Sequence, residues 1–180
     1  RPANLNDHRE RRLTSTSLES ALSSTYSWCG YGTSSCTCSF ISMSMVGYTG
    51  TIPSALGDCT GMYYLDLSDN SLTGTIPESF SSLTSMQILY LQENALTGGV
   101  SPLSSCTSLE QLDLRDNQLN GTLDPLADLT SLTNLHVEGN FFTGEIPSEW
   151  CDDAPNQCQL LSSSYWFDDV AGETQRAYDV

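Results

Sequence analysis

Basic side chains and long apolar runs are the two features in which this sequence is poorest. Its 180 residues contain no lysine, and the 22 acidic residues face 6 arginines, for a formal net charge of −16. Such an excess of negative charge repels phosphate backbones and anionic lipid surfaces, which argues against nucleic acid and membrane-surface binding. No apolar run approaches the ~20 residues that a membrane span needs. Peptides, proteins, cations and uncharged sugars remain as classes of partner.

The few arginines are unevenly distributed. Four of them lie within residues 1–12, where Arg9-Glu10-Arg11-Arg12 resembles a dibasic processing site, although a solvated charged tail explains the same residues. The start of the chain does not read as a signal peptide. Clusters of cysteines near both ends of the chain, however, suggest disulfides and hence an oxidising compartment. We therefore expect a secreted protein, extracellular or associated with a cell wall, whose signal has been removed.

One phrase of about two dozen residues recurs along the chain. Five glycines, spaced 24, 24, 23 and 23 residues apart, mark its copies: Gly50, Gly74, Gly98, Gly121 and Gly144. Apolar pairs one residue apart recur in the same frame, namely Leu65/Leu67, Leu89/Leu91, Leu112/Leu114 and Leu135/Val137, followed by Asn70, Asn94, Asn117 and Asn140. A period of 20 to 29 with L-x-x-L-x-L-x-x-N is the leucine-rich repeat pattern.

Each part of the phrase has a physical reason. In L-x-L the two apolar residues point to the same side of a strand, and stacking at ~4.8 Å per strand lets neighbouring coils cover them. An asparagine amide both donates and accepts, so it can satisfy backbone groups where the chain leaves the sheet. Pro53, Pro77 and Pro147 keep the return segment extended. Each copy therefore provides the surface that the next copy covers.

The endings LTGTIP and FTGEIP, with SALGDCTGMYYLDLSDN between them, resemble plant-type leucine-rich repeat proteins over about residues 38–161. The resemblance implies an α/β-type solenoid, right-handed, with a concave parallel sheet, about five repeats and disulfide-sealed caps. It also implies recognition, inhibitory or cell-wall roles and no enzyme activity. We expect four segments: a Ser/Thr-rich tail or cap extension (1–27), a cysteine cap with Trp28 as its anchor (28–37), the repeats (38–150) and a C-terminal cap and tail (151–180).

Some positions depart from the repeat. Val46 stands where the first coil should carry asparagine, which puts that turn in doubt. Pro102 and Pro125 are displaced by one residue, so the return segments of these coils should differ from the others. Continuing the frame predicts a sixth, degenerate strand over about residues 156–162.

The seven cysteines fall into three groups. Cys151 and Cys158 follow the repeats and are predicted to bond and close the last coil. Cys59 and Cys106 lie two coils apart, too far to bridge, and are interpreted as small buried apolar residues. The three front cysteines then contain one bonded pair and one spare, with the pairing left open; the candidates are Cys29 and Cys36, beside Cys38.

The frame also predicts which residues face solvent on the concave side. They form an acidic face with aromatic residues in its amino-terminal half, suited to a basic peptide. We expect partner contacts from Phe40, Tyr64, Asp66, Asp69, Tyr90, Glu93, Asp113, Asp116, His136 and Glu138. The alternative is that these acidic residues serve solubility alone.

Other functions have weaker support. His136 beside Asp113 and Glu138 lacks a Ser or Cys nucleophile nearby, so no catalytic residue is predicted. A weak calcium site at Asp66, Asp69 and Glu93 lacks a dedicated loop, and neither a metal nor a cofactor is expected. A Thr ladder before the glycines is interpreted as structural. Asn120 begins an N-glycosylation sequon on an exposed turn.

Two functions from different classes compete. The first is a secreted interaction module that binds a protein, peptide or wall polysaccharide. The second is a structural subunit of an extracellular wall or filament, joined end to end through Tyr165, Trp166 and Phe167 or through the amino-terminal tail.

Overall fold

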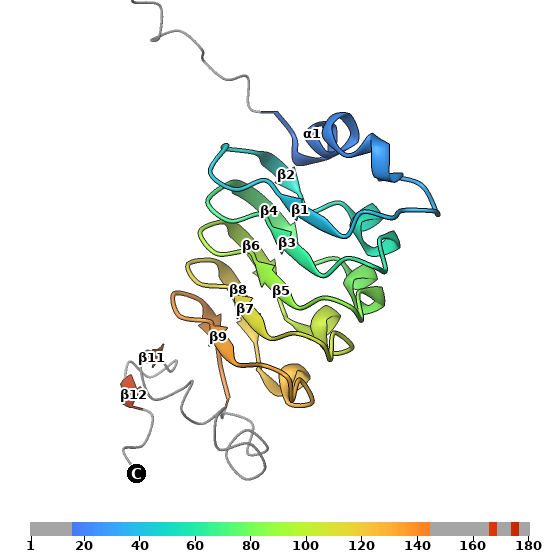
Figure 1. Ribbon diagram of the computed structural model, residues 1–180. Helices are drawn as coiled ribbons and strands as arrows, with labels where there is room; N and C mark the ends of the chain where they lie inside the picture. Colours follow the sequence, from blue (N-terminus) through green and yellow to red (C-terminus); the bar gives the residue numbers. More distant parts are fainter. Residues whose placement is uncertain (1–15, 145–165, 169–173, 177–180) are drawn as a thin grey trace, which may run out of the picture.

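The structure is a computed structural model that describes residues 16–144, 166–168 and 174–176. Five coils stack in one row, and each contributes a strand to two parallel sheets (Figure 1). The concave sheet has the order β1 (Phe40–Ser42), β3 (Tyr64–Asp66), β5 (Ile88–Tyr90), β7 (Gln111–Asp113) and β9 (Asn134–His136). The second sheet consists of β2 (Thr49–Thr51), β4 (Ser71–Thr75), β6 (Ala95–Gly98), β8 (Gln118–Gly121) and β10 (Phe141–Phe142).

Short helices occupy the amino-terminal end and the return segments. The amino-terminal end carries α1 (Leu18–Thr25) and the 3₁₀ helix η1 (Ser27–Cys29). The return segments contain the 3₁₀ helices η2 (Ser54–Asp58), η3 (Glu78–Ser82), η4 (Ser101–Leu103) and η5 (Asp124–Leu126). An antiparallel pair, β11 (Trp166–Asp168) and β12 (Thr174–Arg176), follows. Within the described ranges, no helix combines the length and the hydropathy that a bilayer span requires.

The central leucines form the predicted buried row. Leu65 pairs with Leu89, Leu89 with Leu112, and Leu112 with Leu135, in one register across the concave sheet. All four are almost completely inaccessible to solvent. The repeat period in the sequence therefore predicted both the length of each coil and which leucines point inward, because residues in register on neighbouring strands cover one another.

The asparagines bond to backbone groups at the turns, as predicted, and they also connect successive coils. The amide nitrogen of Asn94 donates to the carbonyl of Leu67 in the preceding coil (3.0 Å) and to that of Leu91 in its own coil (3.1 Å), while its oxygen accepts from the N–H of Leu72 (3.0 Å). The other three asparagines repeat this arrangement. The first coil lacks its own asparagine, but Asn70 reaches back to the N–H groups of Gly47 and Tyr48, so that turn is kept.

The return segments differ as the proline positions predicted. After Pro53 and Pro77, η2 and η3 are five residues long and begin just after the proline. Pro102 and Pro125 lie inside the first turn of η4 and η5, which are three residues long. Pro147 and the predicted sixth strand lie outside the described residues.

The amino-terminal end closes both sheets. The hydroxyl of Tyr26 contacts the N–H and the carbonyl of Ser42, on the free edge of β1. Thr49, on β2, donates its N–H to the carbonyl of Thr16, next to a parallel bridge with Ser17. An exposed strand edge invites pairing with another chain, and these contacts block it.

The prediction that Trp28 anchors this cap is wrong. Trp28 is 80% exposed, whereas Leu18, Leu22 and Tyr31 are buried. The side chain of Tyr31 donates to Glu19 on α1 (3.1 Å), and burial together with the nearby Glu19 charge raises the pKa of this phenol. The cap is anchored by one face of α1, which the sequence pattern did not reveal.

All three front cysteines are bonded, so the predicted spare cysteine does not exist. Cys29 pairs with Cys38, and Cys36 pairs with Cys59 at a Cα–Cα distance of 4.7 Å. The interpretation of Cys59 as a plain apolar residue is therefore wrong. Cys36 precedes Cys59 by 23 residues, one repeat, so stacking brings them together. Cys106 is a buried free thiol, as predicted, and Cys151 and Cys158 lie outside the described residues.

Candidate functional site

Aromatic side chains gather on the amino-terminal half of the concave sheet. The ring of Phe40 stacks on that of Tyr64 with centroids 4.4 Å apart, and Tyr64 meets Tyr90 edge to face at 6.1 Å. Tyr63 adds a tilted contact to Phe40 at 6.5 Å. Phe40 is 48% exposed and Tyr63 is 43% exposed. We call these four residues the aromatic patch. Tyr63 was missed from the sequence because it lies one residue before its strand, outside the strand columns.

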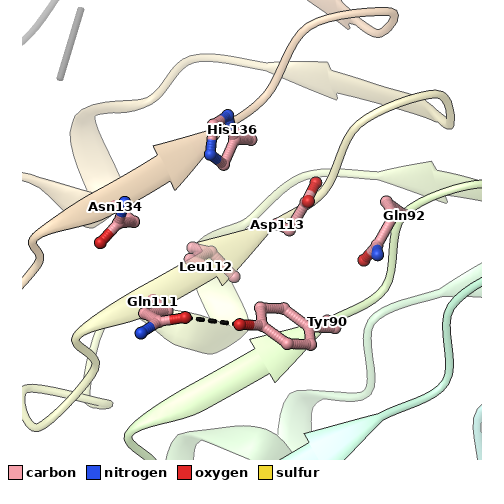
Figure 2. A pocket seen from close by; sticks show the side chains of 7 residues that line it. All are labelled: Tyr90, Gln92, Gln111, Leu112, Asp113, Asn134 and His136. Atoms are coloured by element: carbon pink, nitrogen blue, oxygen red, sulfur yellow. Dashed lines mark hydrogen bonds between the residues drawn. The ribbon is translucent and has the colours of Figure 1, made fainter.

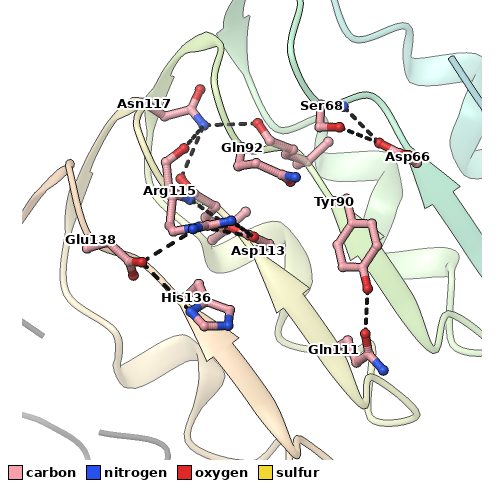
Figure 3. Close-up of polar contacts among 12 residues, drawn as sticks. Asp66, Ser68, Tyr90, Gln92, Gln111, Asp113, Arg115, Asn117, His136 and Glu138 are labelled. Carbon is pink, nitrogen blue, oxygen red and sulfur yellow. Dashed lines mark hydrogen bonds and ion pairs between the residues drawn. The ribbon is translucent and has the colours of Figure 1, made fainter. Parts of the chain in front are cut away.

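A charged network occupies the carboxyl-terminal half of the same sheet (Figure 3). Each carboxylate oxygen of Asp113 accepts two hydrogen bonds from Arg115. Three of the four come from the guanidinium, the shortest at 2.7 Å, and one comes from the backbone N–H. Glu138 lies 3.6 Å from Arg115 and 3.8 Å from the Nδ1 atom of His136. Burial opposes the charge of Arg115, but its hydrogen bond to Asp113 outweighs this and raises the pKa of Arg115.

Asp113 is not the solvent-facing carboxylate that the frame predicted, because it is only 6% exposed. Its neighbour Arg115 folds back over it and neutralises it. The predicted pairing of Asp113 with His136 across adjacent strands is confirmed by their register. Asp66, at the equivalent place two strands away, accepts instead from the N–H and the hydroxyl of Ser68.

Asp69, Glu93 and Asp116 lie past the strands, at the turn that precedes each asparagine. All three have left-handed backbone conformations, with φ of 54°, 55° and 51°. They form a row past the carboxyl-terminal ends of β3, β5 and β7, which we call the acidic rim. Repulsion from Asp69, and less strongly from Asp116, raises the pKa of Glu93. Gly139 takes the same place in the fifth coil, where a Cβ atom would overlap the carboxylate of Asp116.

A small hollow of about 150 Å³ opens on the concave sheet between β5, β7 and β9 (Figure 2). Its lining is polar except for Leu112: Tyr90, Gln92, Gln111, Asp113, Asn134 and His136. The hydroxyl of Tyr90 donates to the side-chain oxygen of Gln111, which fixes the orientation of that amide. The hollow lies next to the aromatic patch, and Tyr90 belongs to both.

The predicted contact residues thus divide between these features. Phe40, Tyr64 and Tyr90 belong to the patch, Asp113, His136 and Glu138 to the network, and Asp69, Glu93 and Asp116 to the rim. Asp66 belongs to none of the three and lies at the end of β3, where it bonds to Ser68. Asn120 is exposed at the end of β8. Trp166 and Phe167 belong to β11, and Tyr165 lies outside the described residues.

Asp69 and Glu93 lie close together in the acidic rim, but with Asp66 they do not form a group with the spacing of metal ligands within the described residues. Among the described residues, the one group with the spacing of metal ligands is Cys36, Cys38 and Cys59. All three are bonded in disulfides, which leaves no thiolate to bind an ion.

Family models match most of the coils. The model described as "Leucine rich repeat" matches residues 49–98, "Leucine Rich repeats (2 copies)" matches residues 84–128, and "Leucine Rich Repeat" matches residues 131–152. Comparison with curated protein sequences finds no match.

Solved structures with the same fold include plant receptors and their ectodomains. One is the leucine-rich repeat ectodomain of GASSHO1/SCHENGEN3 from Arabidopsis thaliana in complex with CASPARIAN STRIP INTEGRITY FACTOR 2, with 32% identity, a TM-score of 0.59 and coverage of 62% of this chain and 14% of that chain. The PEPR1–AtPEP1 structure has 31% identity, a TM-score of 0.65 and coverage of 72% and 18%. The Arabidopsis receptor kinase HAESA, in complex with the peptide hormone IDA and the co-receptor SERK1, has 31% identity, a TM-score of 0.59 and coverage of 62% and 19%.

The coils, the asparagine ladder and the disulfide-tied cap define a short leucine-rich repeat solenoid. The chain belongs to the leucine-rich repeat family, and its repeats are of the plant type. It spans less than one fifth of the length of each of these three matched chains.

Proposed function

We propose that this protein is an interaction module whose concave sheet binds a polypeptide segment carrying an aromatic or aliphatic side chain together with basic residues. The aromatic patch is the observation that carries the proposal. Its most exposed members, Phe40 and Tyr63, place apolar surface in water beside the concave sheet. Exposed aromatic residues are typical anchors of binding sites, where they bury large areas at low entropic cost.

The charges around the patch favour a basic partner. Asp66 lies beside the aromatic patch, and the acidic rim follows the carboxyl-terminal ends of the strands in the same sheet. Glu138 adds a carboxylate at the carboxyl-terminal end of the solenoid, whereas the charge of Arg115 is neutralised by Asp113. A field of one sign steers oppositely charged ligands and raises the rate of association. The rim therefore supports capture of a cationic segment, and the patch supports its retention.

The receptor structures support a peptide as partner. HAESA is described in complex with a peptide hormone and a co-receptor, and GASSHO1/SCHENGEN3 in complex with an integrity factor. The two disulfides of the cap support an extracellular, secreted location, since such bonds persist in oxidising compartments. End-to-end assembly has less support, because Tyr26 and Thr16 cover the free edges of β1 and β2.

Panning of short random peptides displayed on phage against the immobilised protein tests the proposal. We expect selected peptides to carry aromatic or aliphatic residues with Lys or Arg, and to lose binding to the Phe40→Ser/Tyr63→Ser variant. Trp28→Ser is the matched control, since Trp28 is an even more exposed aromatic residue that lies on the cap. If the selected peptides bound the double variant as tightly as the native protein, the concave face would not be the binding site.

The contribution of the rim is tested separately. Asp69→Asn and Asp116→Asn remove two charges, and asparagine tolerates the left-handed backbone conformation at these positions. We expect the association rate of a selected basic peptide to fall and its dependence on salt to weaken, with little change in dissociation. An unchanged salt dependence would show that the rim does not act on the ligand.

A further inference from the structure

The hollow between β5, β7 and β9 has hydrogen-bond donors on one side. The side-chain oxygen of Gln111 accepts from the hydroxyl of Tyr90, so its NH₂ group remains for a ligand. The oxygen of Asn134 lies 3.0 Å from the hydroxyl of Thr133, whose single proton it shares with the carbonyl of Glu110 (2.9 Å), and the NH₂ group of Asn134 has no hydrogen-bond partner among the described residues. These two amides lie on neighbouring strands in direct register.

Acceptors lie on the other side. The side-chain oxygen of Gln92 is buried and has no hydrogen-bond partner among the described residues. The Nδ1 atom of His136 is buried without a hydrogen-bond partner among the described residues and lies 3.8 Å from the carboxylate of Glu138. With its proton on Nδ1, on the side of that carboxylate, His136 has Nε2 as an acceptor. Figure 2 shows Gln92 and Asn134 at opposite ends of the hollow, with His136 between them and above Asp113.

The hollow carries little net charge. Asp113 is the one carboxylate in its lining, and both of its oxygens are held by Arg115. Within the lining, an ammonium group would find no free carboxylate, and a carboxylate would approach that of Asp113. The lining therefore favours an uncharged group that accepts on one side and donates on the other, and a primary carboxamide has this pattern.

We propose that this hollow is a specificity subsite for the carboxamide of an Asn or Gln side chain in the bound peptide. The carboxamide oxygen accepts from the amides of Gln111 and Asn134, and its NH₂ group donates to Nε2 of His136 and to the side-chain oxygen of Gln92. The inference rests on the proposed function, because the peptide must first lie along the concave sheet.

The position of the hollow predicts a sequence spacing in the ligand. The stacked pair of Phe40 and Tyr64 spans β1 and β3, and the hollow is centred on β7, about two and a half strands away. At ~4.8 Å per strand this separation is ~12 Å, and residues i and i+4 of an extended peptide lie ~13 Å apart on one face. We expect an aromatic or aliphatic residue and an Asn or Gln four positions apart.

The test uses peptides selected on the native protein, with affinities measured by fluorescence anisotropy. Replacing the conserved Asn or Gln of a selected peptide by Asp or Leu should weaken binding about tenfold or more, since buried polar groups lose their partners. Gln111→Glu should do the same, because it keeps an acceptor for Tyr90 but replaces the NH₂ donor by a charged carboxylate oxygen, which cannot donate. Gln118→Glu is the matched control: the same change on β8, in the same coil and away from the hollow.

The outcomes separate the two proposals. Peptides that require the aromatic patch and lose affinity with Gln111→Glu, but not with Gln118→Glu, support the subsite. Peptides that require the patch yet tolerate loss of the Asn or Gln, or bind Gln111→Glu as tightly as the native protein, overturn the subsite and leave the proposed function standing. Peptides whose binding does not depend on Phe40 and Tyr63 overturn both.

Discussion

Asn117 offers the most direct test of how the coils are held together. Its side chain is 6% exposed and lies in the middle of the asparagine ladder. The amide nitrogen donates to the carbonyls of Leu91 (3.0 Å), Leu114 (3.1 Å) and Arg115 (3.1 Å), and the oxygen accepts from the N–H of Leu96 (3.0 Å). Asn117→Ala removes all of these bonds without adding a charge or bulk.

The cost follows from what is left unpaired. The N–H of Leu96 loses its side-chain acceptor in a buried position, which costs about 1–3 kcal/mol. The two protons of the amide serve buried carbonyls, and each lost bond costs about 0.5–1.5 kcal/mol. Together these losses amount to about 4 kcal/mol, a large part of the ~5–15 kcal/mol that stabilises an ordinary domain.

Urea unfolding followed by circular dichroism measures this loss. With a slope of about 2 kcal/mol per molar urea, the midpoint of Asn117→Ala should fall by about 2 M. Asn120→Ala is the control, since Asn120 lies in the same coil but is exposed, and its effect should stay within about 0.5 kcal/mol. Equal midpoints for the two variants would refute the view that the asparagine ladder stabilises the stack.

Three further predictions concern the rim, the cap and the turn edge. Glu93→Asn should raise the melting temperature by a few degrees at neutral pH, because asparagine tolerates the left-handed conformation and the repulsion from Asp69 disappears. That gain should shrink as the pH falls below the raised pKa of Glu93, where the native side chain is already protonated. The Cys36→Ala/Cys59→Ala variant should lose about 3 kcal/mol in the same urea assay, from the loop that this bond closes. Peptide mass mapping of protein from its native source should find a glycan on Asn120. If every peptide carried an unmodified Asn120, the prediction that this sequon is glycosylated would be wrong.

The sequence predicted the parts of the fold that the repeat itself specifies. Leu65, Leu89 and Asn94 were placed correctly because each coil uses the same local pattern and needs only its neighbours to bury it. The difference between the return segments also followed from the sequence, since a proline one residue later changes where a short helix can begin.

Interactions between side chains were harder to predict. The repeat frame gives the position of Asp113 along the strand, but it does not show that Arg115 turns back over that carboxylate. Nor does it show that Trp28 points into solvent while α1 supplies the buried contacts of the cap. The bond between Cys36 and Cys59 could have been predicted from the sequence, because a separation of one repeat places two residues side by side in neighbouring coils.

The location of the negative charge changes how ligand recognition should work. The sequence suggested carboxylates across the concave sheet, yet Asp69, Glu93 and Asp116 lie at its edge in left-handed turns, and Asp113 is neutralised. Charges at an exposed edge are screened within ~10 Å at moderate salt, so they act on the approach of a ligand more than on the bound state. Selectivity must then come from the uncharged surface between them, the aromatic patch and the amide-lined hollow. A ligand optimised for this protein should therefore be distinguished from other basic peptides by its uncharged side chains.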